Sequence, residues 1–441
     1  MERYRYPMKI AVIGTGASGM MAAIHAAGKG AEVTCFEQKE KIGKKIYATG
    51  NGHCNFSNTE MQKPDFRAAE FFYASDIEKV EQALHQVGVK EVCTFFEQEG
   101  MLIRNREGYL YPYSGQASTV VELLNRKLQQ KKVTIFCDVK VLAVKKRPDG
   151  HFQLVFQPGE GCDKKNLRNH TLFDKVILAG GGKAAPALGS DGSGLALAAG
   201  LGHHVSGCRP ALCGVKCEGE FFKMLAGVRT AATVRVFSDK ETEILAENTG
   251  EVQLTDYGIS GIPTFQVSHV IGEQLNGLHN TNDETGSGVT AELDFLPDFT
   301  MEYLHRNLQS KLAYSDTQPA TLGKLLGGML NSKLFSCILK QNGLQEETEA
   351  SAQRVEQLLE CFKHFRVKVI ALNDFAQAQV TAGGVPLQEI DENFQSVKIP
   401  GLYLCGELLD IDGICGGYNL QWAWTSGWIA GEAAGRENMA I

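Results

Sequence analysis

The N-terminal part of the chain contains two short apolar runs separated by a run of small residues. Lys9–Ile13 and Glu32–Phe36 are rich in β-branched residues and have the length of buried strands. Ala17–Ala27 lies between them and consists mainly of small residues and Met, as expected for a helix that packs closely on strands. The pattern therefore predicts a strand, a helix and a strand in a β-α-β unit with a parallel sheet.

The stretch GTGASG, which joins the first strand to the helix, has the spacing of a nucleotide-binding turn. Gly14 suits a tight turn, Gly16 lets the backbone approach a pyrophosphate, and Gly19 allows close helix packing. The second strand ends at Glu37, where a carboxylate can bind ribose hydroxyls. A signal peptide and a chance glycine turn are the alternatives, but a strand that stops at Gly14 and an acid at Glu37 favour the nucleotide.

Apolar periodicity predicts further elements in the first half of the chain. The stretch KIGKKIYATGNGHCNFSN, residues 41–58, is rich in Gly, Asn and Lys and is expected to be a long loop. The other expected elements are helical segments within 76–98, a helix over Ala117–Gln130, a hairpin of Val139–Lys146 with His151–Phe156, a buried strand over Val176–Ala179 and a helix from about Gly192.

The second half of the chain changes from strands to helices and back. Residues 205–254 contain short alternating strands, typical of an antiparallel sheet or small barrel, and residues 261–365 are mainly helical. The C-terminal segment returns to a strand, a Gly-rich loop and a helix from about Asn419 to Gly435. The predicted fold class is α/β, with a nucleotide domain that is interrupted by an insert and completed by the C-terminal segment.

Composition limits the partners and the compartment. At 441 residues, the chain exceeds what one hydrophobic core usually holds. Its 44 basic and 51 acidic residues give a net charge of −7 without long blocks of either sign, which argues against nucleic acid and anionic membranes as partners. No uninterrupted apolar stretch has the length of a membrane span. The twelve cysteines form no CxxC pair, which suits reduced thiols in the cytoplasm and predicts no metal site.

Glycine-rich segments follow or bracket the predicted strands at four places: residues 14–19, 43–58, 180–194 and 406–417. Only a large, elongated ligand requires so many backbone approaches in one domain, and FAD is such a ligand. Gly406 and Glu407 cap a strand, where the acid can bind ribitol or ribose hydroxyls. The helix from Asn419 can direct its positive N-terminus at the N1–C2=O edge of an isoalloxazine and favour the reduced anion.

These residues resemble the BaiN/YhiN-type FAD-dependent oxidoreductases, a family that includes proteins described as aminoacetone oxidases. The matching stretches cover the chain in family order: IAVIGTGASGMMAAIHAA, GKKIYATGNGHCNFSN, GYLYPYSGQAS, VILAGGG, LTDYGISGIPTFQVS, TAGGVPLQEID and GLYLCGELLDIDGICGGYNLQWAWTSG. The second and the last are the most specific. The resemblance implies a Rossmann-like FAD-binding domain of residues 1–200 and 370–441, a β-barrel-like insert of 201–260 and 345–369, and a small helical subdomain of 261–344.

The resemblance also implies which residues contact FAD. Around the pyrophosphate and the adenosine it implies Gly14, Gly16, Ala17, Ser18, Gly19, Glu37 and Val141. Along the flavin and at the other strand ends it implies Lys45, Thr49, Gly50, Asn51, Cys54, Asn55, Ala179, Gly180, Gly181, Gly406, Glu407, Asn419 and Leu420. One position departs from the family, which usually has Arg or Lys where this chain has His53.

Two side chains are candidates for proton transfer. The imidazole of His53 titrates near neutrality, although a loop hydrogen bond is the alternative. Tyr111 lies in the stretch GYLYPYSG, whose alternating tyrosines either offer a phenol to a reduced substrate or pack in a strand. A thiol relay through Cys54 or Cys415 is less favoured, because neither has a CxxC partner. Trp424 in the last helix is expected to pack in the core.

The expected function is the reduction of a small organic, enone-like or steroid-like substrate by FAD, with NAD(P)H or another donor. Since the chain has no second GxGxxG with a downstream acid, NAD(P)H is expected to bind only transiently over the flavin. One alternative is a flavin amine oxidase with an aminoacetone-like substrate and oxygen as acceptor. The other is a non-catalytic, flavin-stabilised interaction protein. The sequence carries no signal for an oligomeric state.

Overall fold

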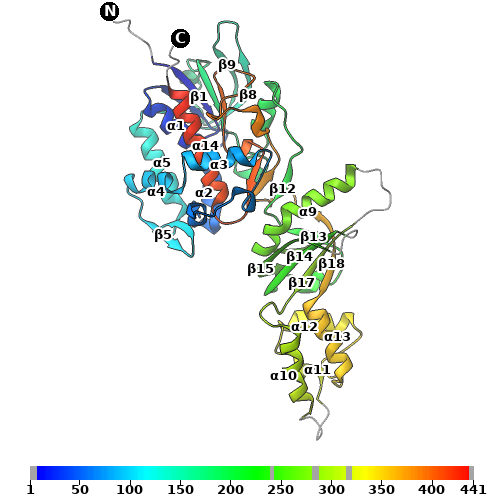
Figure 1. The fold of residues 1–441 in the computed structure, drawn as a ribbon. Coiled ribbons are helices and arrows are strands. Elements are labelled where there is room, and N and C mark those ends of the chain that lie inside the picture. Colours follow the sequence, from blue (N-terminus) through cyan, green and yellow to red (C-terminus); the bar gives the residue numbers. More distant parts are fainter. Residues whose placement is uncertain (1–6, 239–242, 281–287, 314–319, 437–441) are drawn as a thin grey trace, which may run out of the picture. The chain divides into compact units, whose positions relative to one another are not determined.

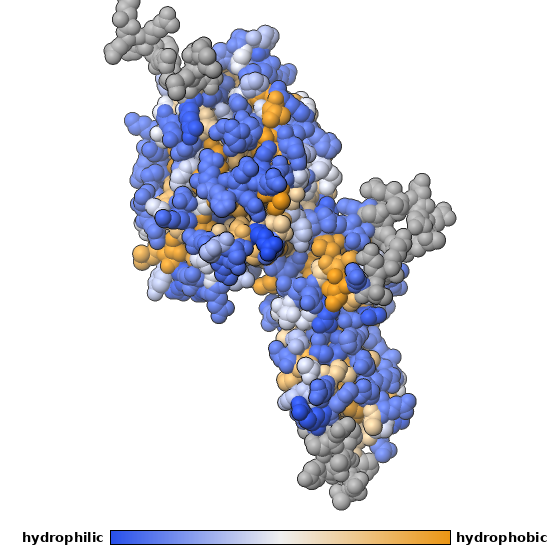
Figure 2. Space-filling model, viewed as in Figure 1, coloured by the Kyte–Doolittle hydropathy of each residue, from blue (hydrophilic) through white to orange (hydrophobic). Residues whose placement is uncertain are grey.

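The computed structural model describes residues 7–238, 243–280, 288–313 and 320–436, and the chain divides into two compact units (Figure 1). The first unit runs up to Arg209 and resumes at Gln379, whereas the second spans Pro210–Ala378. Both present mainly hydrophilic side chains on the face drawn in Figure 2. Residues 1–6, with which a signal peptide would begin, lie outside the described residues. None of the helices in the described ranges combines the length and apolar character that crossing a membrane requires.

The first unit is built on a five-stranded parallel sheet. Its order is β20 (Leu402–Leu404), β11 (Lys175–Leu178), β1 (Lys9–Ile13), β2 (Glu32–Phe36) and β7 (Thr134–Phe136). The strands β1 and β2 have the bounds that the apolar runs predict, and the α/β class with a Rossmann-like sheet is confirmed. Both halves of the first unit contribute strands, because β20 pairs with β11. Four of the five residues of β1 are buried, as expected for a strand covered on both faces.

Helices α1 (Ala17–Gly28) and α14 (Tyr418–Gly435) pack closely on one another in the first unit (Figure 1). Glycines of α14 lie against the backbone of α1, where any Cβ atom would crowd or overlap it. The facing pairs are Gly427 with Ser18, Gly431 with Ala22 and Gly435 with Ala26. Because the residue numbers rise together, the two helices run parallel. Glycines spaced by four thus permit an interhelical approach that larger side chains would prevent.

Shorter elements surround the sheet. The helices are α2 (Lys44–Ala48), α3 (Ile77–Gln86), α4 (Val89–Gln98), α5 (Ala117–Gln130), α6 (Lys164–Leu167) and α7 (Ser193–Gly200). The smaller sheets are β3 (Ser57–Asn58) with β6 (Tyr109–Pro112) and β5 (Ile103–Arg106), β4 (Phe72–Ala74) with β21 (Ile411–Gly413), and β8 (Val139–Lys146) with β9 (Phe152–Pro158) and β10 (Leu172–Phe173). The predicted helix α5 and hairpin β8–β9 are confirmed. The stretch 41–58 is not loop throughout, because α2 forms there around the buried Ile46.

The second unit is a closed six-stranded barrel with attached helices. The barrel order is β13 (Val215–Cys217), β16 (Gly258–Gly261), β15 (Ile244–Leu254), β14 (Arg229–Ser238), β17 (Val289–Asp294) and β18 (Phe365–Leu372). The helices are α8 (Phe222–Leu225), α9 (Ile262–Asn280), α10 (Met301–Ala313), α11 (Leu322–Leu326), α12 (Ser332–Gln341) and α13 (Ala352–Lys363). The barrel-like insert is confirmed. Residues 261–344 are not purely helical, however, because β17 is a barrel strand between β14 and β18.

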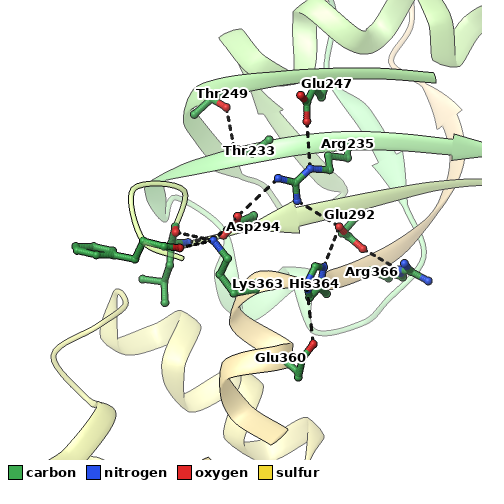
Figure 3. A network of polar contacts seen from close by, with 12 residues as sticks. Thr233, Arg235, Glu247, Thr249, Glu292, Asp294, Glu360, Lys363, His364 and Arg366 are labelled. Atoms are coloured by element: carbon green, nitrogen blue, oxygen red, sulfur yellow. Dashed lines mark hydrogen bonds and ion pairs between the residues drawn. The ribbon is translucent and has the colours of Figure 1, made fainter. Parts of the chain in front are cut away.

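A network of buried charges joins α13 to the barrel (Figure 3). Glu292 and Asp294 of β17 are each 3% exposed. Glu292 accepts from Arg366 at 2.9 Å and from Arg235 at 3.4 Å. Asp294 pairs with Lys363 at 2.6 Å, and the Lys363 ammonium also donates to two backbone carbonyls after β17, at 2.9 and 2.7 Å. The last residue of α13 is therefore anchored where β17 ends.

Candidate functional site

The predicted glycine turns and the acid meet at one edge of the parallel sheet. Because all five strands run in the same direction, their carboxyl ends share that edge. The residues found there are Gly14 after β1, Glu37 after β2, Ala179, Gly180 and Gly181 after β11, and Gly406 after β20. A 2.9 Å hydrogen bond from the Gly43 N–H to the Thr15 carbonyl brings the segment 43–58 to the same edge.

The turn between β1 and α1 depends on its glycines. Gly14 has a φ of +92°, and a Cβ there would overlap the carbonyl oxygen of Ala179. A Cβ at Gly19 would likewise overlap the Gly14 carbonyl. In contrast, a Cβ at Gly16 would meet no atom within 4 Å, and Gly16 begins α1 without a side-chain cap. The turn therefore leaves open space at a positive helix start, which fits a phosphate group.

Backbone donors hold Glu37 at the end of β2. Its carboxylate accepts from the N–H groups of Thr15 at 3.0 Å and Lys39 at 2.9 Å. The residue is 8% exposed, and burial raises the pKa of its carboxyl group. The Glu37 carbonyl accepts from the Val139 N–H at 2.9 Å, so that β8 begins beside the acid, with the buried Val141 two residues further on. Glu37 and β8 together form one wall of the site.

A second acid, Glu407, joins several loops. One of its oxygens accepts from the Lys45 ammonium at 2.7 Å, and the other accepts from the Thr381 N–H at 2.8 Å. The Thr381 hydroxyl accepts in turn from the N–H groups of Lys183 and Ala184, at 2.7 and 3.0 Å. The side chains of Lys45 and Glu407 are 25% and 20% exposed. The pair therefore fixes the loops, and each group keeps an accessible edge for a ligand.

Two residues of the site were not predicted from the sequence. Thr381 of β19 (Val380–Ala382) lies in the stretch TAGGVPLQEID, but its role depends on loops that are distant in sequence. Thr15 lies inside GTGASG and is fully buried, and its hydroxyl has no hydrogen-bond partner in the described part of the chain. An orphaned buried hydroxyl in a glycine turn is a group that a bound ligand can satisfy.

The starts of α1 and α14 lie in series along the site. Both helices begin at a glycine that provides no side-chain cap, Gly16 and Gly417. Since Ser18 faces Gly427 in the parallel pair, α14 begins eight residues, or about 12 Å, beyond the start of α1. Two positive helix ends at this spacing suit an elongated ligand with electron-rich groups at two points.

The first turns of these helices contain five of the predicted contact residues, among them Gly19, described above. Ala17 and Ser18 begin α1, and Asn419 and Leu420 lie in the first turn of α14. The Asn419 amide accepts from the Gly413 N–H at 2.8 Å and donates to the carbonyl of the same residue at 2.7 Å. The side chain of Asn419 thus orders the loop that leads into α14.

The loop between α2 and β3 has a strained backbone. Gly50, Asn51 and Cys54 have φ values of 55°, 52° and 54°, in the left-handed region. Non-glycine residues are uncommon in this region and gather at functional sites. The Thr49 hydroxyl donates to a carbonyl of α2 at 2.6 Å, and Asn55, in the amide orientation that satisfies both of its groups, donates to a carbonyl of β3 at 2.7 Å. These side chains hold the loop in its unusual conformation.

One candidate for proton transfer, His53, lies in this loop, and the other, Tyr111, borders it. The Nδ1 of His53 donates to the Gly115 carbonyl at 2.6 Å, which is the loop hydrogen bond that the sequence leaves open. Tyr111 is half-buried on β6, and burial raises the pKa of its phenol. A Cβ at Gly50 would lie 3.8 Å from the Tyr111 ring. A catalytic role for either side chain stays a prediction.

Two thiols near the site stay protonated, and two tryptophans near it pack in the core. Burial raises the pKa of Cys54 and of Cys415 to about 12, so both remain protonated near neutral pH. Trp424 is fully buried, which confirms its predicted core packing, and its indole donates to a backbone carbonyl at 2.9 Å. Trp422 is also buried, and it donates to the Gly406 carbonyl at 3.2 Å, so that it supports the loop before Glu407.

A parallel sheet with a GxGxxG turn, a buried acid at the next strand end and two uncapped helix starts in series is the architecture of a dinucleotide-binding domain, the class to which FAD-dependent oxidoreductases belong. The chain belongs to the family described as HI0933-like protein Rossmann domain, whose model matches residues 8–433. The match confirms the resemblance to the BaiN/YhiN-type FAD-dependent oxidoreductases.

Individual relatives agree with this assignment. The chain is 41% identical over 433 residues to the 3-dehydro-bile acid delta(4,6)-reductase of Clostridium scindens, which covers 97% of this chain and 98% of the relative. It is 27% identical to a ribosomal RNA dihydrouridine synthase of Haemophilus influenzae, and the matched region covers 97% of this chain and 98% of that relative. The solved structure of a 3-ketosteroid-delta4-(5alpha)-dehydrogenase from Rhodococcus jostii RHA1 has a TM-score of 0.50 at 14% identity, covers 99% of this chain and 98% of its own, and supports the fold.

Proposed function

We propose that the protein reduces a carbon–carbon double bond conjugated to a carbonyl group in a steroid-like substrate. The observation that carries this proposal is the 41% identity, over nearly the whole of both chains, to a relative named as a reductase of 3-dehydro bile acids. The Haemophilus relative is named for dihydrouridine, in which a double bond conjugated to a carbonyl has likewise been saturated. The two names share one reaction class, although their substrates differ in size and charge.

FAD is proposed to lie along the sheet edge, from Glu37 to the start of α14. The adenosine ribose would contact Glu37 with the adenine near Val141, the pyrophosphate would lie at residues 14–19, and the flavin would lie along 45–55 and 406–420. The open space in the glycine turn, the orphaned buried hydroxyl and the offset of the two helix starts support this placement. When bound, FAD supplies the hydride chemistry.

The chain is proposed to supply the proton and to stabilise negative charge. Hydride addition to the β-carbon of an enone leaves negative charge on the carbonyl oxygen and requires a proton at the α-carbon. Tyr111 is the proposed proton donor, because it borders the strained loop and its raised pKa keeps the phenol protonated at neutral pH. His53 is the second candidate. The uncapped start of α14 would stabilise negative charge that develops near it.

NAD(P)H is the proposed electron donor, bound transiently. The chain has one GxGxxG turn with a downstream acid, and the proposal assigns that turn to FAD. The twelve free cysteines support a reducing compartment such as the cytoplasm.

Anaerobic mixing of the holoenzyme tests the proposal. We expect NADH or NADPH to bleach the flavin and a 3-oxo-4-ene steroid to restore its absorbance. The variant Tyr111→Phe should slow the second step about tenfold or more and change the first by less than about twofold. Bleaching by aminoacetone alone, with rapid reoxidation by oxygen and none by the steroid, would favour the amine oxidase instead. A flavin that no donor reduces would favour the non-catalytic alternative.

A second candidate is the reduction of uridine in ribosomal RNA, which the similarity to the Haemophilus synthase favours. The net charge of −7 and the lack of long basic blocks weigh against a polyanionic substrate. Adding a ribosomal RNA fragment to the reduced enzyme separates the two candidates. Reoxidation of the flavin by RNA but not by the steroid would replace the first proposal.

A further inference from the structure

We propose that Arg104 and Arg106 bind an anionic group of the substrate, so that the enzyme prefers a steroid-like carboxylic acid to its neutral counterpart. The inference rests on the proposed function, because it concerns the substrate of the same site. It adds a specificity determinant on the β5–β6 hairpin, which lies outside the FAD-contacting segments.

The register of the hairpin places cations and phenols on one face. Arg104 pairs with Tyr111, and Arg106 pairs with Tyr109. Directly paired residues of an antiparallel hairpin point to the same side, and alternate residues of a strand share a face. The four side chains therefore form one surface. Leu110, which lies between the two tyrosines, is 4% exposed and packs on the opposite side.

Aromatic rings orient both guanidinium groups without neutralising them. The Arg104 guanidinium lies 4.3 Å from the ring centroid of Tyr113, and that of Arg106 lies 5.6 Å from the centroid of Tyr111. None of the ion pairs between described residues includes either arginine. A guanidinium stacked on a ring keeps its in-plane N–H donors, which match the two oxygens of a carboxylate. The hairpin thus presents two cations that lie over aromatic rings and have no acidic partner among the described residues.

The same face adjoins two loops of the proposed flavin site. Tyr111 lies next to Gly50, as described above, and a Cβ at Gly416 would lie 2.9 Å from the Tyr109 ring. The Asn58 amide donates to the Gly416 carbonyl at 3.0 Å and ties β3 to the loop that precedes α14. A substrate whose double bond lies over the flavin could therefore extend a charged side chain along the hairpin.

An apolar acid fits this surface better than RNA does. Phosphates also bind arginine and bases stack on tyrosine, but an RNA duplex or loop requires positive charge over a wider area than one two-stranded hairpin. The relative with 41% identity is named for a bile acid, and a single carboxylate next to an apolar ring system requires only a local pair of cations.

Binding to the oxidised holoenzyme tests the inference independently of turnover. The ligands are a 3-oxo-4-ene steroid with a side-chain carboxylic acid and its methyl ester, measured by titration calorimetry. We expect the acid to bind about tenfold more tightly than the ester. The double variant Arg104→Gln and Arg106→Gln should lose about tenfold in affinity for the acid and less than about twofold for the ester. The control Arg147→Gln alters an exposed arginine that pairs with Asp149 at 3.0 Å, and it should change neither affinity.

The remaining outcomes separate this inference from the proposed function. Equal binding of acid and ester by the wild type, or equal weakening of both in the double variant, would overturn the inference. Charge-selective binding without any reoxidation of the flavin by the acid would remove the proposed function and leave the two arginines as an anion-binding site for a ligand that is not reduced. A double variant that loses binding of a ribosomal RNA fragment, but keeps that of the acid, would assign the arginines to RNA. Retained flavin absorbance in each variant verifies that the fold is intact.

Discussion

Buried carboxylates are satisfied in opposite ways in the two units. In the barrel unit, Glu292 and Asp294 are paired with arginine and lysine side chains (Figure 3). Burial opposes the ionisation of Glu292, but hydrogen bonds from His364 and Arg366 outweigh it and lower the pKa of Glu292. In the sheet unit, Glu37 accepts backbone hydrogen bonds, which do not outweigh burial, and its pKa is raised.

The difference separates a structural network from a binding site. Charges that are paired from several sides have little remaining capacity for a ligand and serve to fix the elements that carry them. A carboxylate oriented by backbone N–H groups keeps acceptor positions for hydroxyl groups. The four variants below probe the barrel unit once and the sheet unit three times, in order of their expected effect on the free energy of unfolding.

Lys363→Met should have the largest effect, because it leaves Asp294 buried without its closest cation. Removing one partner of a buried pair costs about 3–5 kcal/mol. Far-ultraviolet circular dichroism follows the unfolding of both units, whereas the three tryptophans all lie in α14 and report on the sheet unit alone. We expect the transition followed by circular dichroism to occur at a lower denaturant concentration, while the variant retains its flavin. Lys368→Met, at an exposed position of β18, is the matched control.

Gly431→Val should destabilise the other unit by about 3 kcal/mol, because its side chain would overlap the Ala22 carbonyl between the parallel helices. Tryptophan fluorescence should then report a transition at lower denaturant concentration. Gly200→Val introduces the same side chain at the end of α7, where a Cβ meets no atom within 4 Å. It should lower the free energy of unfolding by less than Gly431→Val does. Equal destabilisation by both variants would contradict the close packing of α1 and α14.

His25→Phe should make the sheet unit less sensitive to acid. Burial lowers the pKa of His25 from 6.5 to about 4, and its ring stacks on Trp428 with centroids 3.9 Å apart. The folded state disfavours protonation of His25, whereas the unfolded state allows it near pH 6.5. The contribution of neutral His25 to the free energy of unfolding is therefore complete above pH 6.5 and is lost as the pH falls towards 4, by up to about 3 kcal/mol. Denaturation followed at pH 7, 5 and 4 should show a smaller loss in the variant. His85→Phe, at an exposed position of α3, should keep the wild-type slope.

Gly16→Val should have the smallest effect on folding and a large effect on FAD. A Cβ at this position meets no protein atom, so the unfolding free energy without cofactor should change by less than about 1 kcal/mol. The same side chain would fill the space proposed for the pyrophosphate, and FAD content after purification should fall about tenfold or more. Wild-type flavin content, measured against released FAD standards, would refute the assignment of the turn.

Local signals made much of the sheet unit predictable. The strands β1 and β2 and the start of α1 depend on residues that are neighbours in sequence, and the glycines mark where each element ends. The helix α2 escapes such reasoning because its stretch is rich in Gly, Asn and Lys, while the burial of Ile46 depends on tertiary packing. The strand β17 escapes it because its partners, β14 and β18, are distant in sequence.

The site was predictable to a similar extent. The GxGxxG turn and Glu37 have a spacing that is meaningful by itself, and the structure brings them to one edge. The three hydrogen bonds of Thr381, to the loop at Lys183 and Ala184 and to Glu407, have no sequence signature. The pairing of Arg104 with Tyr111 likewise becomes visible only when the hairpin register is known.

The parallel packing of α1 against α14 also constrains how the protein is made. About 390 residues separate the two helices, and a ribosome that adds roughly 5–20 residues per second needs about 20–80 seconds to span them. During that time α1 presents its small-residue face without a partner and the parallel sheet lacks β20, whereas the barrel unit is contiguous and can fold as soon as it emerges. The nucleotide-binding unit, although it begins first, is therefore completed last, and its nascent half waits longest for its packing partners.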